Sequence, residues 1–350
     1  MSNKTKHSNF EESMRETALR LAIEEENRRK TDPNETHERS IIILGSKGIG
    51  KTTMVYRFLE KDERPKPTIA MDYSFGRKTV KSLVKNIVHV WEVGHLASSL
   101  VSVAMTGFTL THSPHHTVIL IMLDLSRPEE LWTSFEETLS VLRSGLKMSY
   151  DSDTIQKLRE KRITNMKKDI ERGIDPFPMQ MCILGGRYDE FKEFDSDKKE
   201  FIGKILRAIA HNLGASLYYY SSKDKFLVRR LKDLLSHYGF GSSFTEEKCT
   251  DYEKPLMMPA GADSFGRIDL QFPQTRPSSA ILDTIKQIYI SRIPQVSKSD
   301  ESTLEDPSND PNFNEPIIDR LRMQREEEIS VLLSDMMEGR MPKIPVPDPI

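Results

Sequence analysis

A glycine-rich segment near the start of the chain has the residue types and the spacing of a phosphate-binding loop. Residues 45–52 read Gly-Ser-Lys-Gly-Ile-Gly-Lys-Thr, which matches G-x-x-x-x-G-K-[ST] at every fixed position. In such a loop the backbone N–H groups surround phosphate oxygens, the lysine brings positive charge to the β and γ phosphates, and the hydroxyl group binds Mg²⁺. A chance glycine-rich turn is the alternative interpretation. The predicted phosphate contacts are Gly45, Ser46, Lys47, Gly48, Gly50, Lys51, Thr52 and Thr53, with Thr52 as the Mg²⁺ ligand when a nucleotide is bound.

Elements that would position this loop lie on both sides of it. The apolar run at 41–44 is typical of a strand, and residues 53–59 can continue as the helix whose positive end faces the phosphates. From residue 40 to about 240, strand-like runs alternate with helical stretches, which predicts an α/β fold with a mostly parallel sheet and helices on both faces. Predicted strands cover 40–44, 68–73, 86–91, 117–123, 179–184 and 216–220, and predicted helices cover 128–146, 153–170, 195–213 and 224–238.

Changes in composition divide the chain into four predicted regions. They are an amphipathic N-terminal arm in 1–35 with a helix at 8–30, the phosphate-loop domain in 36–245, an irregular strap with a short helix (281–293) packed on the domain in 246–293, and a linker, a helix at 315–339 and a disordered end in 294–350. The apolar stripe of the N-terminal helix packs either on the domain or on another protein, whereas the stripe on 315–339 predicts a partner surface. The basic helix at 153–170 is either a solvated insertion or a docking face.

Composition excludes several classes of protein. The 350 residues, 37% hydrophobic and 30% charged, can bury one substantial core. No apolar stretch is long enough to span a membrane and the first thirty residues are too charged for a signal peptide, which predicts a soluble cytosolic protein with no direct membrane contact. A formal net charge of −2 gives no drive toward nucleic acid. Cys182 and Cys249 lack metal-like spacing, so we expect free thiols rather than a disulfide or a zinc site.

Two segments fall where Ras-like GTPases carry their switch residues. Thr68 has the spacing of a switch threonine, although a threonine that merely starts a strand is the equal alternative. The strand at 86–91 runs into Trp91-Glu92-Val93-Gly94-His95, where an Asp-x-x-Gly motif would stand. Gly94 keeps its place, but Trp91 occupies the Asp position, so we expect the Glu92 carboxylate on the opposite face of the strand, away from a metal. His95 either polarises water or is an ordinary loop residue.

A later segment stands where GTPases recognise the base. Gly185-Gly186-Arg187-Tyr188-Asp189 follows the strand at 179–184 in the place of Asn-Lys-x-Asp. Asp189 would accept both guanine N–H bonds and Arg187 would stack over the base, whereas Gly186 removes the Asn side chain. Ser222 and Lys223 follow the next strand and would close over the base. These residues predict GDP or GTP with Mg²⁺ as the ligand, with guanine preferred to adenine; an empty site is the alternative.

Short motifs spread along the chain occur together in one known family. They are Arg64-Pro65-Lys66-Pro67-Thr68, Asp72 to Arg77, Trp91-Glu92-Val93-Gly94, Leu123 to Pro128 with Leu131-Trp132, Ile174 to Pro178, Gly185 to Asp189 and Ala260 to Gly266. With the phosphate loop, they resemble the dynein light intermediate chains, specifically the cytoplasmic dynein 2 type that serves cilia. The resemblance covers residues 40–290 and, more weakly, 310–325. Gly186 and His95 depart from it, since the family pattern has Ser and a small residue there.

The resemblance implies a Ras-like P-loop fold in a non-catalytic subunit of the dynein 2 motor. Such a subunit binds and stabilises the dynein 2 heavy chain, which hydrolyses ATP, during retrograde intraflagellar transport and cilium assembly. Through the complex, the other dynein 2 intermediate and light chains and the intraflagellar transport trains are implied partners. The implied locations are the cytoplasm, the ciliary axoneme and basal body, and the cytoskeleton. The alternatives are a slow regulatory GTPase switch that uses Lys51, Thr52 and Mg²⁺, and a cargo adaptor that acts through the C-terminal helix.

Overall fold

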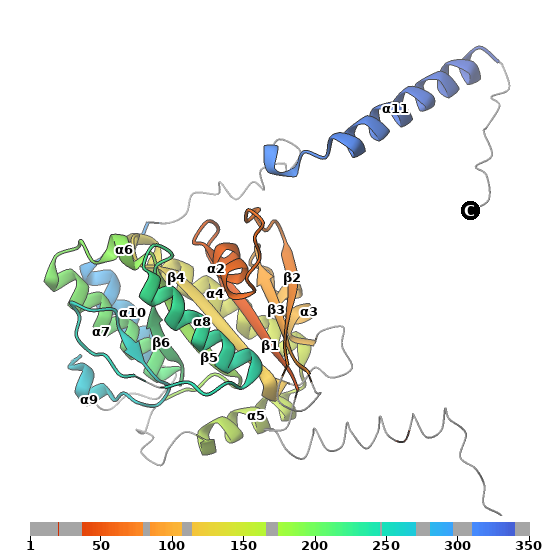
Figure 1. Cartoon of the computed structure of the whole chain (residues 1–350). Coiled ribbons are helices and arrows are strands. Elements are labelled where there is room, and N and C mark those ends of the chain that lie inside the picture. Colours follow the sequence, from red (N-terminus) through yellow and green to blue (C-terminus); the bar gives the residue numbers. More distant parts are fainter. Residues whose placement is uncertain are drawn as a thin grey trace, which may run out of the picture. The chain divides into compact units, whose positions relative to one another are not determined.

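The apolar runs of the sequence become the strands of a central sheet in the computed structural model of this chain (Figure 1). The structure describes Arg20 and residues 37–79, 85–106, 114–165, 174–245, 247–270, 281–296 and 310–339. The described strands are β1 (Glu38–Gly45), β2 (Met71–Thr79), β3 (Lys85–Val93), β4 (Thr117–Asp124), β5 (Gln180–Gly186), β6 (Ser216–Tyr219) and β7 (Met257–Met258). They form one sheet in the order β2-β3-β1-β4-β5-β6-β7, in which only β2 and β7 pair antiparallel with their neighbours.

The predicted helices of the domain form within a few residues of their expected ends. The described helices are α2 (Lys51–Phe58), α3 (Ser98–Thr106), α4 (Pro128–Ser149), α5 (Ser152–Asn165), α6 (Tyr188–Phe191), α7 (Ser196–Asn212), α8 (Lys225–Phe240), α9 (Phe265–Ile268), α10 (Ile281–Arg292) and α11 (Pro316–Met337). Local chemistry explains several of these ends. Pro128 opens α4, where its missing N–H costs nothing. Asp224 caps α8 by accepting bonds from two backbone N–H groups of the first turn, and Gly241 ends it at φ 67°.

Alternate residues of β1 pack against helices on opposite faces of the sheet. Ile42 and Leu44 belong to a core shared with α3, α4, α7 and α10, whereas Ile41 and Ile43 belong to a core shared with α2 and α8. All four side chains are at most 1% exposed. Burying an Ile or Leu side chain stabilises a fold by about 1.5–3 kcal/mol. The two cores therefore hold β1 and the start of the following loop rigidly between two layers of helices.

The first edge strand differs from its prediction. We expected a strand at 68–73, but β2 begins at Met71 and continues to Thr79. Ala70 instead receives hydrogen bonds from the backbone N–H groups of Gly94 and His95, which leaves the preceding residues as a loop over the end of β3. Only one side of an edge strand is paired and β2 is largely exposed, so apolar periodicity marks its limits poorly.

Helix α3 was not predicted, because its stability comes from tertiary packing. Its sequence, Ser98 to Thr106, is short and contains two valines, which have low helix propensity. It packs on α4, where Gly145 leaves room for Val101: a Cβ on this glycine would lie 2.8 Å from a methyl carbon of Val101. This contact is a property of two segments together, and neither segment reveals it alone.

The strap after residue 245 is more regular than its composition predicts. Residues 257–258 add β7 to the edge of the sheet, and Phe265–Ile268 forms the short helix α9. Buried Leu256 and Ile268 anchor these turns to the domain. Residues 295 and 296, which we assigned to the linker, still bond to α4: the Gln295 carboxamide accepts from the Trp132 N–H and the Val296 N–H donates to Glu129.

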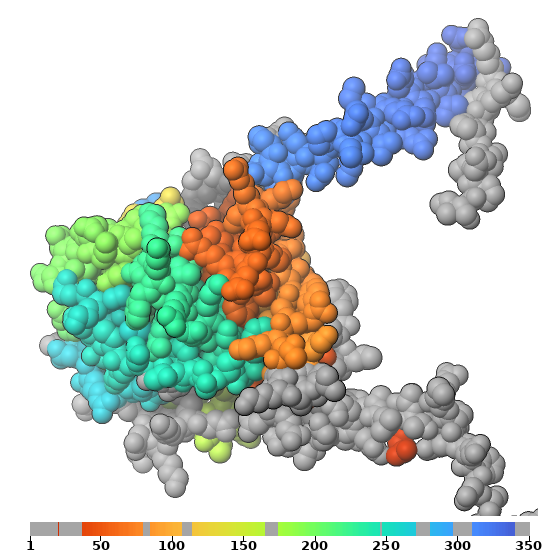
Figure 2. All heavy atoms as spheres, in the orientation of Figure 1, coloured from red at the N-terminus to blue at the C-terminus, as the bar shows by residue number. Residues whose placement is uncertain are grey.

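The chain divides after Lys298 into two units, and the second contains α11. This helix, blue in Figure 2, carries Ile329, Leu333 and Met336, each of which is more than half exposed. The predicted N-terminal helix at 8–30 and the end of the chain beyond 339 lie outside the described residues. Among the described residues, no helix is both long enough and apolar enough to span a membrane. Cys182 and Cys249 are free thiols, as expected.

Candidate nucleotide-binding site

The loop between β1 and α2 has the backbone geometry of a phosphate cradle. Gly48 and Gly50 have φ angles of 77° and 100°, in the left-handed region that favours glycine. A Cβ on either residue would meet nothing within 4 Å, so the space beside the loop is open. Helix α2 begins directly after Gly50, and the free N–H groups of its first turn therefore face this space. The predicted loop residues 45–53 thus form a place for an anion.

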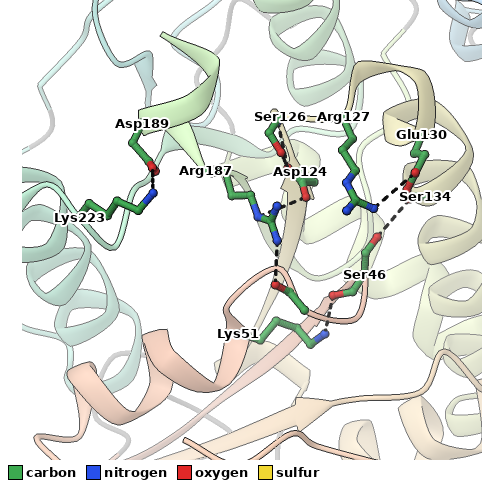
Figure 3. A network of polar contacts seen from close by, with 11 residues as sticks. Ser46, Lys51, Asp124, Ser126, Arg127, Glu130, Ser134, Arg187, Asp189 and Lys223 are labelled. Atoms are coloured by element: carbon green, nitrogen blue, oxygen red, sulfur yellow. Dashed lines mark hydrogen bonds and ion pairs between the residues drawn. The ribbon is translucent and has the colours of Figure 1, made fainter. Parts of the chain in front are cut away.

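Lysine 51 is held inside the loop by the loop itself. Its Nζ donates to the backbone oxygen of Gly45 at 2.8 Å and to that of Ser46 at 3.0 Å, and Figure 3 shows the second of these bonds. The residue is only 5% exposed. The Ser46 hydroxyl in turn donates to Ser134 of α4 at 3.1 Å, which ties the loop to the helix layer. Burial lowers the pKa of Lys51 to about 8, and the negative charge of Glu92 opposes this shift.

Glutamate 92 faces the phosphate loop, and our prediction that it points away is wrong. The Thr52 hydroxyl donates to its Oε1 at 2.7 Å, while Trp91 packs in the core on the opposite face of the sheet. Register explains this result: Glu92 pairs with Ile43, whose side chain lies on the α2 face, and Trp91 pairs with Ile42. We had assigned the two faces from the position that Asp takes in Ras-like GTPases, rather than from the pairing with β1.

A cavity of about 300 Å³ lies where the γ-phosphate end of a nucleotide would lie. Lys51, Thr52, Thr68, Glu92 and Gly94 all line it, together with Lys47, Gly48, Gly50, Thr53 and Pro65 to Pro67. The Thr68 hydroxyl lies 3.5 Å from that of Thr52. Gly94 allows this close approach, since a Cβ there would lie 2.2 Å from the backbone oxygen of Thr68. The structure thus brings the predicted switch residues to the loop, whereas exposed His95 does not line the cavity.

The predicted base-binding residues line a second cavity of about 290 Å³, which shares Gly48, Gly50 and Thr53 with the first. Its wall includes Arg187, Asp189, Ser222 and Lys223. The Asp189 carboxylate accepts from Ser221 Oγ and from Lys223 Nζ, both at 2.6 Å. Burial opposes ionisation of Asp189, but these two bonds outweigh it and lower the pKa. An ionised carboxylate can accept about four hydrogen bonds, so Asp189 could also accept bonds from a guanine while Ser221 and Lys223 hold it in place.

Asp124, at the end of β4, is the residue that our site prediction missed. Its Oδ1 accepts from the backbone N–H and the hydroxyl of Ser126, and its Oδ2 lies 3.5 Å from Nε of Arg187 (Figure 3). Arg187 also donates to the backbone oxygen of Gly48 at 3.2 Å, so it links β4 to the phosphate loop instead of lying free over a base. One sequence signal could have identified Asp124: it is an acidic residue at the carboxyl end of an apolar strand that lies beside β1.

The residues of the first cavity fit a Mg²⁺–nucleotide. Glu92 is 2% exposed, and among the described residues its buried Oε2 has no hydrogen-bond partner. A hard cation prefers oxygen ligands, and the Thr52 hydroxyl and this carboxylate supply two. Burial raises the pKa of Glu92, against the effect of Thr52 and Lys51, and a bound cation would favour the charged carboxylate. Lys51 and the loop N–H groups would hold the phosphates. Ser221, Lys223 and Asp189 would position the base.

We expect nucleotide affinity to fall at alkaline pH because Lys51 loses its proton. With a pKa of about 8 in the free protein and a higher value beside phosphate, the affinity for GDP should weaken about tenfold between pH 7 and pH 9. Stability of the free protein changes in the opposite sense. Because the folded pKa lies below the unfolded value, the free energy of unfolding rises with pH above about 8. Calorimetric titration and urea unfolding at each pH measure both trends, and Lys51→Met should remove both.

Comparison with known proteins relates the sequence of this chain to a known family. The family described as dynein light intermediate chain (DLIC) matches residues 16–183. Cytoplasmic dynein 2 light intermediate chain 1 of Bos taurus is 34% identical over 342 residues, which cover 90% of this chain and 94% of that protein. The Homo sapiens protein of the same name is 34% identical over 85% of this chain and 88% of its own length, and that of Danio rerio is 33% identical over 87% and 88%.

A solved structure also shares the fold. The crystal structure of the dynein light intermediate chain's conserved domain superposes with a TM-score of 0.54 at 16% identity, over 80% of this chain and 99% of that one. At this identity the match shows the Ras-like fold, while the sequence relatives carry the family assignment over nearly the whole chain. This chain belongs to the dynein light intermediate chain family, and within it to the cytoplasmic dynein 2 type.

Proposed function

We propose that this chain is a non-catalytic subunit of the cytoplasmic dynein 2 motor that binds and stabilises the heavy chain. The observation that carries the proposal is the 34% identity to a cytoplasmic dynein 2 light intermediate chain along 90% of the chain. The relatives are named as light intermediate chains of the cytoplasmic dynein 2 motor. For this chain we propose a role in retrograde intraflagellar transport and cilium assembly. The proposed partners are the heavy chain directly, and through the complex the other intermediate and light chains and the transport trains. The proposed places of action are the cytoplasm, the axoneme and the basal body.

The geometry of the first cavity supports a nucleotide that stabilises the domain and is not hydrolysed. Hydrolysis needs a group that orients water and positive charge that stabilises the transition state. His95, the water-orienting candidate, is exposed and does not line the cavity, and the described residues that do line it include no arginine. The loop is also internally satisfied: its lysine bonds to two backbone oxygens and its threonine to Glu92. Phosphate binding in this arrangement would rigidify the domain rather than drive a reaction.

A slow regulatory GTPase is the second candidate. The sequence predicted that Glu92 points away from the metal position, whereas its observed position beside Thr52 favours this candidate. A carboxylate 2.7 Å from the Thr52 hydroxyl is well placed to support Mg²⁺. If this candidate is correct, purified protein should release phosphate from GTP with multiple turnovers, and Glu92→Gln and Lys51→Ala should each abolish the release. Turnover that survives both substitutions would indicate a contaminant, and absence of Mg²⁺-dependent turnover in the wild type would reject the switch.

The docking role predicts which changes weaken heavy-chain binding. We expect deletion of 1–35 or of 316–350 to reduce co-purification with tagged heavy chain about tenfold or more, because apolar anchors dominate interface energies. Leu333→Asp on the exposed stripe of α11 should act like the deletion, and Ser334→Asp, one residue later, should not. Lys51→Ala should leave binding nearly unchanged. Equal recovery of heavy chain by every variant would contradict the proposal, and so would a loss confined to Lys51→Ala.

A further inference from the structure

A third cavity lies away from the nucleotide site, between α7 and the strap. Its volume is about 450 Å³, which is within the usual range of roughly 300–1,000 Å³ for small-ligand sites. None of its lining residues lines either nucleotide cavity. One wall is α7 and the other comes from residues 248–252 and from α9, which contacts α7 directly (Figure 1). The strap motif of residues 260–266, which the nucleotide site does not use, leads into this wall.

The lining of this cavity is strongly cationic. Lys204, Arg207, Lys248 and Arg267 contribute positive charge, and Asp269 is the single acidic residue among the described residues that line it. Of the four cations, Lys204 pairs with Glu200 at 2.8 Å, and the Lys248 ammonium donates to a backbone oxygen, that of Ala262, at 2.7 Å. A backbone oxygen carries no formal charge, so Lys248 remains uncompensated. No hydrogen bond or ion pair to another described residue engages the exposed Arg267 guanidinium.

Arg207 of α7 holds the strap residues Asp263 and Tyr252 in place beside this cavity. Its guanidinium binds both oxygens of Asp263 at 2.7 and 2.8 Å and donates to the Tyr252 hydroxyl at 2.5 Å. A guanidinium has five N–H donors, and these contacts use three. Arg207 thus fixes Tyr252 in the wall of the cavity, and the hydroxyl groups of Thr250 and Tyr252 add polar groups to that wall. The strap is thus held so that donors from three segments of the chain converge on one space.

We propose that this cavity binds a phosphate monoester dianion. A tetrahedral dianion uses several donors from different directions and gains most from arginine, which binds phosphate by paired hydrogen bonds. Lys248 and Arg267 supply the two positive charges that a dianion requires, since the other cations are already paired. Tyr252 and Ile268 give the wall an apolar part that suits the carbon chain attached to the phosphate. The source is either a free phosphorylated metabolite or a phosphoserine in a peptide, and the phosphate group is common to both.

Amide-resolved NMR of the full chain tests this proposal, because it separates the cavity from the phosphate loop. Titration with phosphoserine at millimolar concentrations should shift the amides of 248–252 and 264–269 saturably, in the wild type and in Lys51→Ala alike. Lys248→Ala with Arg267→Ala should weaken that binding about tenfold or more. Lys254→Ala, which removes one positive charge from a residue that does not line the cavity, should not weaken it. Thermal unfolding checks that each variant keeps the fold.

Further titrations distinguish a free phosphorylated metabolite from a phosphoserine peptide and show which results would overturn the proposal. Equal binding of inorganic phosphate would mean that the phosphate group alone is recognised, and tighter binding of a phosphoserine peptide would indicate a peptide source. Both results support the proposal. Equal shifts with the unphosphorylated peptide, no saturable shift in these amides, or undiminished binding by the Lys248→Ala, Arg267→Ala variant would each overturn it.

Discussion

Replacing Arg207 with alanine should lower the free energy of unfolding of the domain by about 3–5 kcal/mol, the usual cost of breaking a buried ion pair. The Arg207 and Asp263 side chains are only 4% and 6% exposed. Without the guanidinium, the Asp263 carboxylate keeps a bond from the Ser264 N–H but loses both charged donors. A buried carboxylate without a counter-charge is costly because water no longer solvates it. Urea unfolding of the full chain, followed by circular dichroism, measures the loss.

Two companion variants separate charge from packing. Arg207→Leu with Asp263→Leu leaves no lone charge, and we expect it to cost less than Arg207→Ala. Lys254→Ala breaks an ion pair whose side chains are 70% and 48% exposed, and it should cost about 1 kcal/mol or less. An Arg207→Ala loss as small as that of Lys254→Ala would show that the strap does not depend on this pair.

Tyr289→Ala should destabilise the domain by a similar amount, about 3–5 kcal/mol, because it empties a large aromatic site in the core. Tyr289 is 0% exposed. Its ring stacks on Phe201 of α7 with centroids 6.0 Å apart, and it lies 5.9 Å from the ring of Trp132 in α4. Its hydroxyl donates to the backbone oxygen of Pro128 at 2.7 Å. One side chain of α10 therefore holds this helix to two others.

Tyr289→Phe is the matched control for this site. It removes the hydroxyl and keeps the ring, and the oxygen of Pro128 still accepts a bond from Gln295 at 3.1 Å. No buried acceptor is left unpaired, so we expect a loss of only about 1 kcal/mol. Both variants are compared by urea unfolding. Equal losses for the two substitutions would mean that the hydroxyl, and not the ring packing, anchors α10.

The two anchoring sites explain why residues 247–270 and 281–296 form part of the domain despite their composition. Prolines and glycines give this segment little periodicity, and the sequence alone predicts an irregular strap. Two of its residues hold it to the domain at separate places: Asp263 through the charged pair with Arg207 of α7, and Tyr289 through aromatic packing. With a total stability of about 5–15 kcal/mol for a typical domain, either substitution would remove a large share. A partner that recognises the strap surface would then lose its rigid template.

Residue spacing predicted the glycine-rich loop between β1 and α2, and it predicted the face of Glu92 wrongly. The loop is local: its glycines, lysine and threonine act through backbone geometry that contiguous residues specify. The orientation of Glu92 depends on which residue of β1 lies opposite it, and that register is set by pairing between segments about fifty residues apart. Asp124 was missed for a related reason. Its carboxylate is linked to the phosphate loop only through Arg187, which is distant in sequence.

By itself, the sequence determined the alternation of strands and helices, the phosphate loop and the family, since apolar periodicity and short motifs are properties of neighbouring residues. Tertiary structure decided which side chains meet. It brought Thr68 and Glu92 to the loop, engaged both Asp189 and Arg187 with protein partners, and gathered four cations in a cavity beside the strap. These arrangements depend on strand register and on packing between segments far apart in the chain, which act only once the whole fold has formed.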